Sequence, residues 1–129
     1  IQKYWLKGDK AGTSEIFIEN LPGFPDNVSS NEEGIFWVAL FNPRNSFVEM
    51  SSNKPFLRKM VLRLPESLQP QPLNHSYVLG IDEGGKVVHN LQFKAKEAYS
   101  PITSVKQYES DLYFGSLTHT GWGKIEAPK

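Results

Sequence analysis

Short apolar runs, each bounded by turn-forming residues, follow one another along almost the whole chain. The longest run, Ile35–Phe41, covers seven residues, which suits one buried strand and is too short to cross a bilayer. Clusters of Gly, Pro, Asn and Asp separate the runs and favour turns. This pattern predicts an antiparallel all-β protein. The expected strands are Ile1–Leu6, Ser14–Glu19, Asn27–Ser30, Ile35–Leu40, Tyr77–Asp82, Lys86–Phe93, Thr103–Tyr108, Leu112–Leu117 and Gly123–Ala127.

One segment departs from this pattern and predicts an amphipathic helix over Lys54–Leu64. Pro55 suits a first helical turn and Pro65 ends the helix. Its apolar residues share one face: Phe56, Leu57, Met60, Val61 and Leu64. Its basic residues are Lys54, Arg58, Lys59 and Arg63. We expect the apolar side to pack on the sheets and the basic side to face solvent, with a membrane or partner contact as the alternative. Gln69–Pro72 then forms a stiff polar connector.

A weak internal repeat indicates how the strands are grouped. EEGIFWVAL and ESDLYFGSL share an order of acidic turn, bulky apolar residues and small residue. Without the helix and connector, their separation is close to one propeller blade of about 40–50 residues. We expect residues 1–19 to end one blade, residues 20–93 to form a full blade with a helix near 54–64, and residues 94–129 to form a partial last blade. Such a chain cannot close a ring, so the remaining blades come in cis or from other chains in trans. A self-contained small β-sandwich is the alternative.

The composition excludes several classes of function. Fourteen basic residues balance fourteen acidic ones with no run of like charge, which argues against a nucleic-acid partner. The absence of cysteine excludes disulfides, zinc-thiolate sites and a thiol nucleophile. Any metal must therefore be held by oxygen or imidazole. The chain starts at Ile1 without Met or an apolar leader, so we expect it to be a segment of something longer.

Two sequons, at Asn27 and Asn74, would permit N-glycosylation in a secretory compartment. We favour Asn74 as the glycosylated residue. A glycoprotein of this kind belongs to the secretory, endomembrane pathway, which includes the endoplasmic reticulum, the vacuole and the cell surface.

Four stretches together carry a resemblance to a known family. They are KYWLKGDKAGTSEIFIENLPGFPDN, GIFWVALFNPRNSF, PFLRKMVLRLP and LYFGSL. In combination they closely resemble the C-terminal third of the strictosidine synthase-like family, which includes adipocyte plasma membrane-associated protein. The resemblance implies a six-bladed β-propeller of the calcium-dependent phosphotriesterase superfamily. This chain would supply about two blades with one inserted amphipathic helix.

The resemblance also implies a calcium ion in the central tunnel, held by carboxylates and Asn amides from several blades. In the related gluconolactonases the matching loop contributes its Asp, and paraoxonases use an Asp-Asn pair. Asp26 and Asn27 are therefore the expected metal residues, and their oxygens suit calcium. The set is incomplete, because the other ligands come from earlier blades. An Asn27 that faces the tunnel would be a poor glycan acceptor.

The stretch Gly23–Asn27, GFPDN, has a second interpretation as a turn between strands. Proline presets a turn, and Asp and Asn side chains satisfy local backbone groups. The residues alone favour this turn, whereas the resemblance favours a metal position.

The resemblance also bears on catalysis. Strictosidine synthases proper condense an amine with an aldehyde and use a catalytic glutamate before the final long strand pair. Aligned backwards from Leu112–Gly115, that position falls at Ser100, and Ala98–Ser104 contains no acidic residue. Glu97 is the nearest acid. Because serine cannot take up the amine proton as a carboxylate would, the condensation reaction is disfavoured.

Three functions follow. The first is a calcium-dependent hydrolase of small-molecule esters or lactones, arylesterase- or lactonase-like, active only in a complete ring, so that the isolated chain is inactive. The second is a non-catalytic secretory or membrane-associated binding propeller that does not span the membrane in this segment. The third is the disfavoured amine–aldehyde synthase. No catalytic residue is assigned within the chain.

The aromatic and imidazole residues give weaker indications. The histidines show no metal or triad spacing, and are expected at the surface or in hydrogen bonds: His75, His89 and His119. The tryptophans are expected to fill spaces between blades: Trp5, Trp37 and Trp122.

Overall fold

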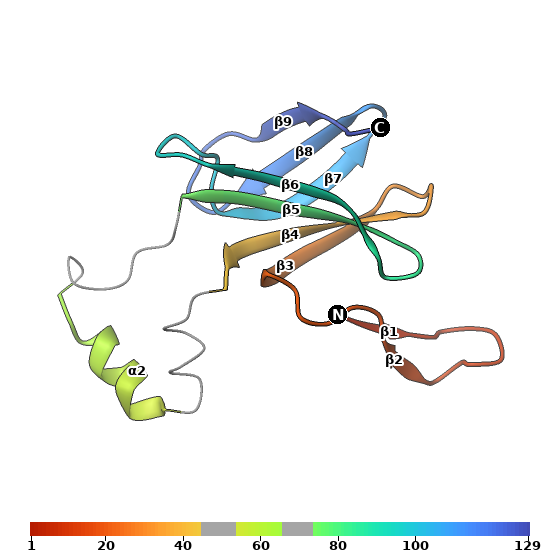
Figure 1. Ribbon diagram of the computed structural model, residues 1–129, viewed down its shortest axis with the longest axis horizontal. Helices are drawn as coiled ribbons and strands as arrows, with labels where there is room; N and C mark the ends of the chain where they lie inside the picture. The colour runs from red at the N-terminus through yellow and green to blue at the C-terminus, as the bar shows by residue number, and fades with distance from the viewer. Residues whose placement is uncertain (45–53, 66–73) are drawn as a thin grey trace.

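The computed structural model describes residues 1–44, 54–65 and 74–129. In these ranges it contains nine strands and one helix, and the strands form three antiparallel sheets (Figure 1). The all-β prediction is confirmed, and the open sheets are those of part of a propeller and not of a closed ring. The predicted connector Gln69–Pro72 lies outside the described residues.

The elements follow the predicted order. The first sheet pairs β1 (Gln2–Tyr4) with β2 (Ser14–Ile16). The central sheet contains, in spatial order, β3 (Gly23–Ser30), β4 (Ile35–Pro43), β5 (His75–Asp82) and β6 (Val87–Lys94). The third sheet contains β7 (Ile102–Tyr108), β8 (Asp111–Ser116) and β9 (Gly123–Glu126). Helix α2 (Pro55–Leu62) lies between β4 and β5 in the sequence. The grouping of these sheets into blades stays a prediction.

Strand β4 explains why the longest apolar run is continuous. It lies between β3 and β5, and its successive side chains enter two different cores. Trp37 and Ala39 pack with residues of the β7–β9 sheet, whereas Val38 and Leu40 pack on the opposite face towards Phe17. Strand β4 is therefore buried on both faces, and such a strand needs no polar alternation.

Polar groups join the central sheet to the β7–β9 sheet. The indole Nε1 of Trp37 donates a hydrogen bond of 2.7 Å to Oε1 of Gln107. The hydroxyl of Ser29 donates to the carbonyl oxygen of Val105 at 2.7 Å, and Nζ of Lys106 donates to the carbonyl oxygen of Ser30 at 3.0 Å. We call this set of contacts the seam. Because these partners lie about 70 residues apart in sequence, the seam fixes the relative position of two distant segments.

The turn between β5 and β6 lies against Phe17, which directly follows β2, and this leads to one prediction. Gly85 has a φ of +84°, and an added Cβ would clash with the backbone carbonyl oxygen of Phe17. Gly8 has nearly the same φ, +82°, but an added Cβ would meet no atom within 4 Å. Both alanine variants carry left-handed strain of about 1–2 kcal/mol. We expect Gly85→Ala to lose about 1 kcal/mol more than Gly8→Ala in urea unfolding, within the 1–3 kcal/mol range for overpacking. Equal losses would contradict the contact between the turn and Phe17.

Three expectations are wrong in detail. Strand β3 begins at Gly23 and not at Asn27, since the preceding residues still pair with β4. Trp122 is 68% exposed and does not fill a space between the described sheets, because it stands beside the edge strand β9 with its ring against Tyr113. Within the described residues, α2 contacts none of the strands, so its apolar side does not pack on the sheets.

Candidate functional site

The stretch GFPDN is part of strand β3, so the interpretation of it as a turn is wrong. Phe24 pairs with Asn42, and Pro25 pairs with Leu40. The next pair joins Asn27 to Ala39, so Asp26 is the additional residue of a β-bulge. Strand β3 is also the first strand in the order of the central sheet. A bulge at such an edge re-aims side chains and is over-represented beside active sites.

Local chemistry explains why the bulge forms at this point. Gly23 lies so close to β4 that an added Cβ would stand 2.7 Å from the carbonyl oxygen of Asn42. Pro25 has no N–H to donate to a ladder, so it is tolerated at bulges and edges of sheets. The side chain of Arg44 donates through Nε to the carbonyl oxygen of Leu21 at 2.8 Å, which fastens this end of β4 to the approach to β3.

Asp26 and Asn27 are adjacent in the bulge and both are exposed. A carboxylate and an amide oxygen are ligands of the kind that calcium prefers, but calcium takes about six to eight oxygens. The ranges that the structure describes contain no group of three or more His, Cys, Asp or Glu placed to hold a metal. The two residues therefore fit calcium in chemistry, and form only part of a ligand set.

Asn42 faces this stretch across the ladder, and sequence reasoning missed it. Its Cα pairs with that of Phe24, and its side-chain oxygen Oδ1 is buried with no hydrogen-bond partner among the described residues. Unpaired buried acceptors are uncommon in folded proteins. No sequence signal identifies Asn42, because a polar residue after an apolar run is common at the end of a strand.

Ser100 lies in the interior and holds two segments together. It is 8% exposed, and its hydroxyl donates to the carbonyl oxygen of His75 at 3.2 Å. The same Oγ accepts a hydrogen bond of 3.1 Å from the backbone N–H of His75. The hydroxyl of Thr118 donates to the carbonyl oxygen of Ser100 at 3.1 Å. Ser100 thus connects the start of β5 to the segment before β7, which is a structural role.

Asn74 is exposed immediately before β5. Its Nδ2 donates a hydrogen bond of 3.3 Å to the carbonyl oxygen of Lys96. The exposure leaves room for a glycan at this position, and its glycosylation stays a prediction.

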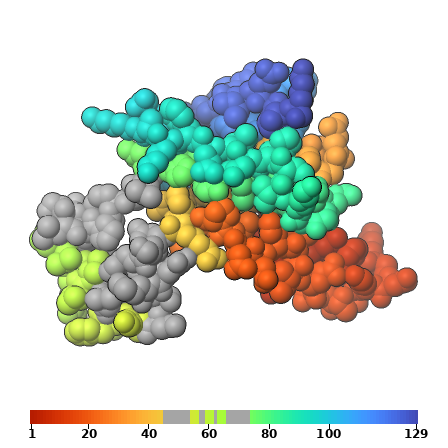
Figure 2. Space-filling model, viewed as in Figure 1, coloured from red at the N-terminus to blue at the C-terminus, as the bar shows by residue number. Residues whose placement is uncertain are grey.

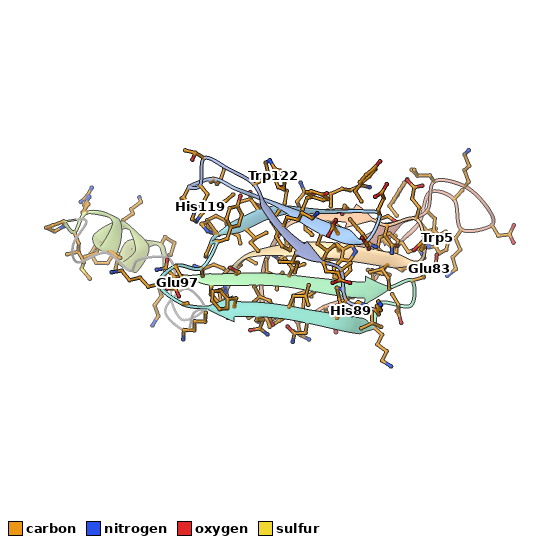
Figure 3. The ribbon with its side chains drawn as sticks, turned by 90° about the horizontal axis from the view of Figure 1, so that it is seen from above. Trp5, Glu83, His89, Glu97, His119 and Trp122 are labelled. Carbon is orange, nitrogen blue, oxygen red and sulfur yellow. The ribbon has the colours of Figure 1, made fainter. Side chains whose placement is uncertain are left out.

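The histidines do not converge on one site. His75 stacks on Tyr77 at 5.3 Å between ring centroids, and its Nε2 lies 3.0 Å from Oε1 of Gln92. His89 stacks on Trp37 at 5.4 Å, and His119 stacks on Tyr99 at 4.6 Å. Figure 3 shows His89, on β6, and His119, in the loop between β8 and β9, far apart. Each imidazole ring stacks on an aromatic side chain, as expected for structural histidines.

The shifted pKa values also belong to structural residues. Burial raises the pKa of Tyr77, which belongs to the core on the face of the central sheet towards Phe17. The hydrogen bond to Asp111 raises the pKa of Lys124, and the two side chains are 2.7 Å apart on β8 and β9. Lys10, which bonds Glu15 at 2.9 Å, lowers the pKa of that carboxyl. None of these three groups lies on β3.

Comparisons with known proteins identify relatives over most of the chain. Strictosidine synthase-like protein 3 of Arabidopsis thaliana is 37% identical over 123 residues, which cover 91% of this chain and 31% of that protein. Adipocyte plasma membrane-associated protein of Bos taurus is 29% identical over 123 residues, covering 91% of this chain and 30% of that protein. Strictosidine synthase-like protein 13 of Arabidopsis thaliana is 40% identical over 95 residues, covering 70% of this chain and 23% of that protein.

No protein-family model matches the chain. The chain spans about a third of the length of the first curated relatives that it matches. The likeness to them extends over most of the three sheets, since it covers 91% of the chain. This chain is a homologue of the strictosidine synthase-like proteins and of adipocyte plasma membrane-associated protein over most of its length.

Proposed function

We propose that this chain supplies Asp26 and Asn27 as two oxygen ligands of a calcium site in a strictosidine synthase-like propeller. The complete ring, with its other blades in cis or in trans, would hydrolyse small-molecule esters or lactones. Bound calcium would polarise the carbonyl group and lower the pKa of a water nucleophile. The isolated chain would be inactive, because two ligands do not hold calcium and the walls of a substrate pocket are missing.

The bulge in β3 is the observation that carries this proposal. Asp26 has no partner in the ladder with β4, and both Asp26 and Asn27 are exposed at the first strand of the central sheet. In a regular strand two successive side chains point to opposite faces. A bulge changes this alternation and allows neighbouring residues to serve one site.

A non-catalytic binding propeller is the second candidate. Ser100, at the position expected for the catalytic glutamate of a synthase, is buried and bonded to the backbone of His75. This favours either the hydrolase or a binding role over amine–aldehyde condensation.

In the part of the chain that the structure describes, no helix has the length and apolar character of a membrane span. One group of relatives is named for association with the plasma membrane, and we extend membrane or secretory association, with glycosylation at Asn74, to this chain as part of the proposal.

The test is a hybrid protein in which this chain replaces the matching third of strictosidine synthase-like protein 3. Calcium about tenfold above its dissociation constant is expected to stabilise the hybrid by about 1.4 kcal/mol in thermal unfolding. Asp26→Ala should abolish that stabilisation and the calcium-dependent hydrolysis of aryl esters or lactones, because the site loses a charged ligand. The chain alone should show neither property.

Asp9→Ala is the matched control, since Asp9 is also exposed but lies in the turn between β1 and β2. This variant should keep both the calcium stabilisation and the hydrolysis. Hydrolysis that persists in chelator, or calcium stabilisation that survives Asp26→Ala, would reject the proposed site. Calcium stabilisation without hydrolysis would support the metal site and favour the binding propeller.

A further inference from the structure

Helix α2 presents an apolar surface that no sheet covers. In the described ranges it makes no contact with any strand, and Figures 1 and 2 show it at one end of the molecule, with the β1–β2 hairpin at the other. The side chain of Phe56 is 80% exposed and that of Met60 is 50% exposed. Four residues separate them, so the two side chains lie on the same face of the helix, about 40° apart around its axis. A large aromatic and a flexible thioether thus stand side by side in solvent.

The charged residues of the helical segment 54–65 all have one sign. The segment 54–65 contains four basic residues and no acidic residue, while the whole chain is neutral, so the other residues together carry a net charge of −4. Lys54, Lys59 and Arg63 are exposed. Lys59 immediately precedes Met60, and Arg63 caps the C-terminal end of the helix. A local excess of positive charge therefore lies beside the exposed apolar pair.

We propose that α2 is a docking element for the surface of an anionic membrane. Phe56 and Met60 would enter the boundary between headgroups and acyl chains, while Lys59 and Arg63 would contact lipid phosphates and carboxylates. Short amphipathic helices with an aromatic apolar face and a basic polar face bind membranes in this manner. A fluid lipid surface needs no complementary groove, so a single helix with two apolar anchors is enough for binding to it. The proposal is independent of the calcium site, because α2 and the bulge of β3 lie in separate elements.

Co-sedimentation with lipid vesicles tests the proposal on the 129-residue chain. Vesicles with about one third phosphatidylserine should bind the chain, and pure phosphatidylcholine vesicles should bind it far more weakly. Each basic residue near such a surface contributes about fivefold in affinity, so K59Q combined with R63Q should weaken binding about 30-fold. Phe56→Ser should weaken it about tenfold or more, since a buried aromatic anchor is lost. Higher salt should weaken binding of the unaltered chain.

Matched controls test whether vesicle binding depends on this surface or on overall charge and hydrophobicity. K86Q combined with K94Q removes two lysines near β6, and Leu117→Ser removes an apolar side chain that is 77% exposed. Both controls should bind as the unaltered chain does, and circular dichroism should show the same β-sheet signal in all variants. Failure of the unaltered chain to bind anionic vesicles would overturn the proposal and favour an acidic protein surface as the partner. Equal losses in the control variants, or equal binding to neutral vesicles, would also overturn it.

Discussion

Replacing Trp37 with alanine is expected to lower the free energy of unfolding by about 3–5 kcal/mol. The indole ring is only 1% exposed and lies in the core between the central sheet and the β7–β9 sheet. Gly80 lies so near that an added Cβ would stand 2.9 Å from Cζ3 of Trp37, so the packing around the ring is close. Truncation also leaves Gln107 without its 2.7 Å donor. Since domains are stable by about 5–15 kcal/mol, the variant should lose much of its stability.

Trp122→Ala is the control for this change, because the same side chain is removed from a position that is 68% exposed. Its effect should stay within about 0.5 kcal/mol, as for most surface substitutions. Urea unfolding followed by far-ultraviolet circular dichroism compares the two variants without relying on tryptophan fluorescence. Similar losses in both would contradict the conclusion that Trp37 holds the two sheets together.

The different environments of these two tryptophans show what a sequence can predict. Trp37 stands inside a continuous apolar run, and such a run predicts a strand with neighbours on both faces. Trp122 stands between Gly121 and Gly123, at the start of an edge strand, where only one neighbouring strand can cover it. Residue type alone predicted the same burial for both. The period and length of the surrounding run carried the information that residue type lacked.

The all-β fold and the helix were predictable because both depend on local patterns. Alternation, turn residues and the proline before Phe56 act over a few positions, and the observed α2 begins at Pro55, one residue after the predicted start. The place where α2 would pack was not predictable, since its spacing defines an apolar face without defining what covers it. The β3 bulge was also missed. The position of the bulge depends on how β3 pairs with β4, and the residues of GFPDN alone do not determine that pairing.

The candidate site was predictable only in part. Asp26 and Asn27 entered through the family resemblance, whereas their own residue types favoured a turn. The structure places them in a bulge of β3. For Ser100 the resemblance implied only that serine stands where a synthase would have its glutamate. Its burial against His75 depends on contacts across 25 positions, which no local pattern predicts.

The second large effect is expected where a carboxylate is introduced at Ser100. At pH 7, Ser100→Glu should be less stable than the uncharged Ser100→Gln by about 3 kcal/mol, since the site is 8% exposed. Burial would raise the pKa of the introduced carboxyl in the folded state by about two units or more above the unfolded value of about 4.3. Each unit corresponds to about 1.36 kcal/mol. Both variants lose the hydroxyl bonds to His75, so their difference isolates the charge.

The pH dependence of this difference gives the sharper test. A folded-state pKa above the unfolded one means that the two variants should be equally stable below about pH 4, where the carboxyl is protonated in both states. The deficit of Ser100→Glu should then grow as the pH rises through the folded-state pKa, and reach its full size above it. Urea unfolding at several pH values measures both curves. A deficit that is absent at every pH would mean that the carboxylate reaches solvent from this position, and the case against a synthase would then lose its structural support.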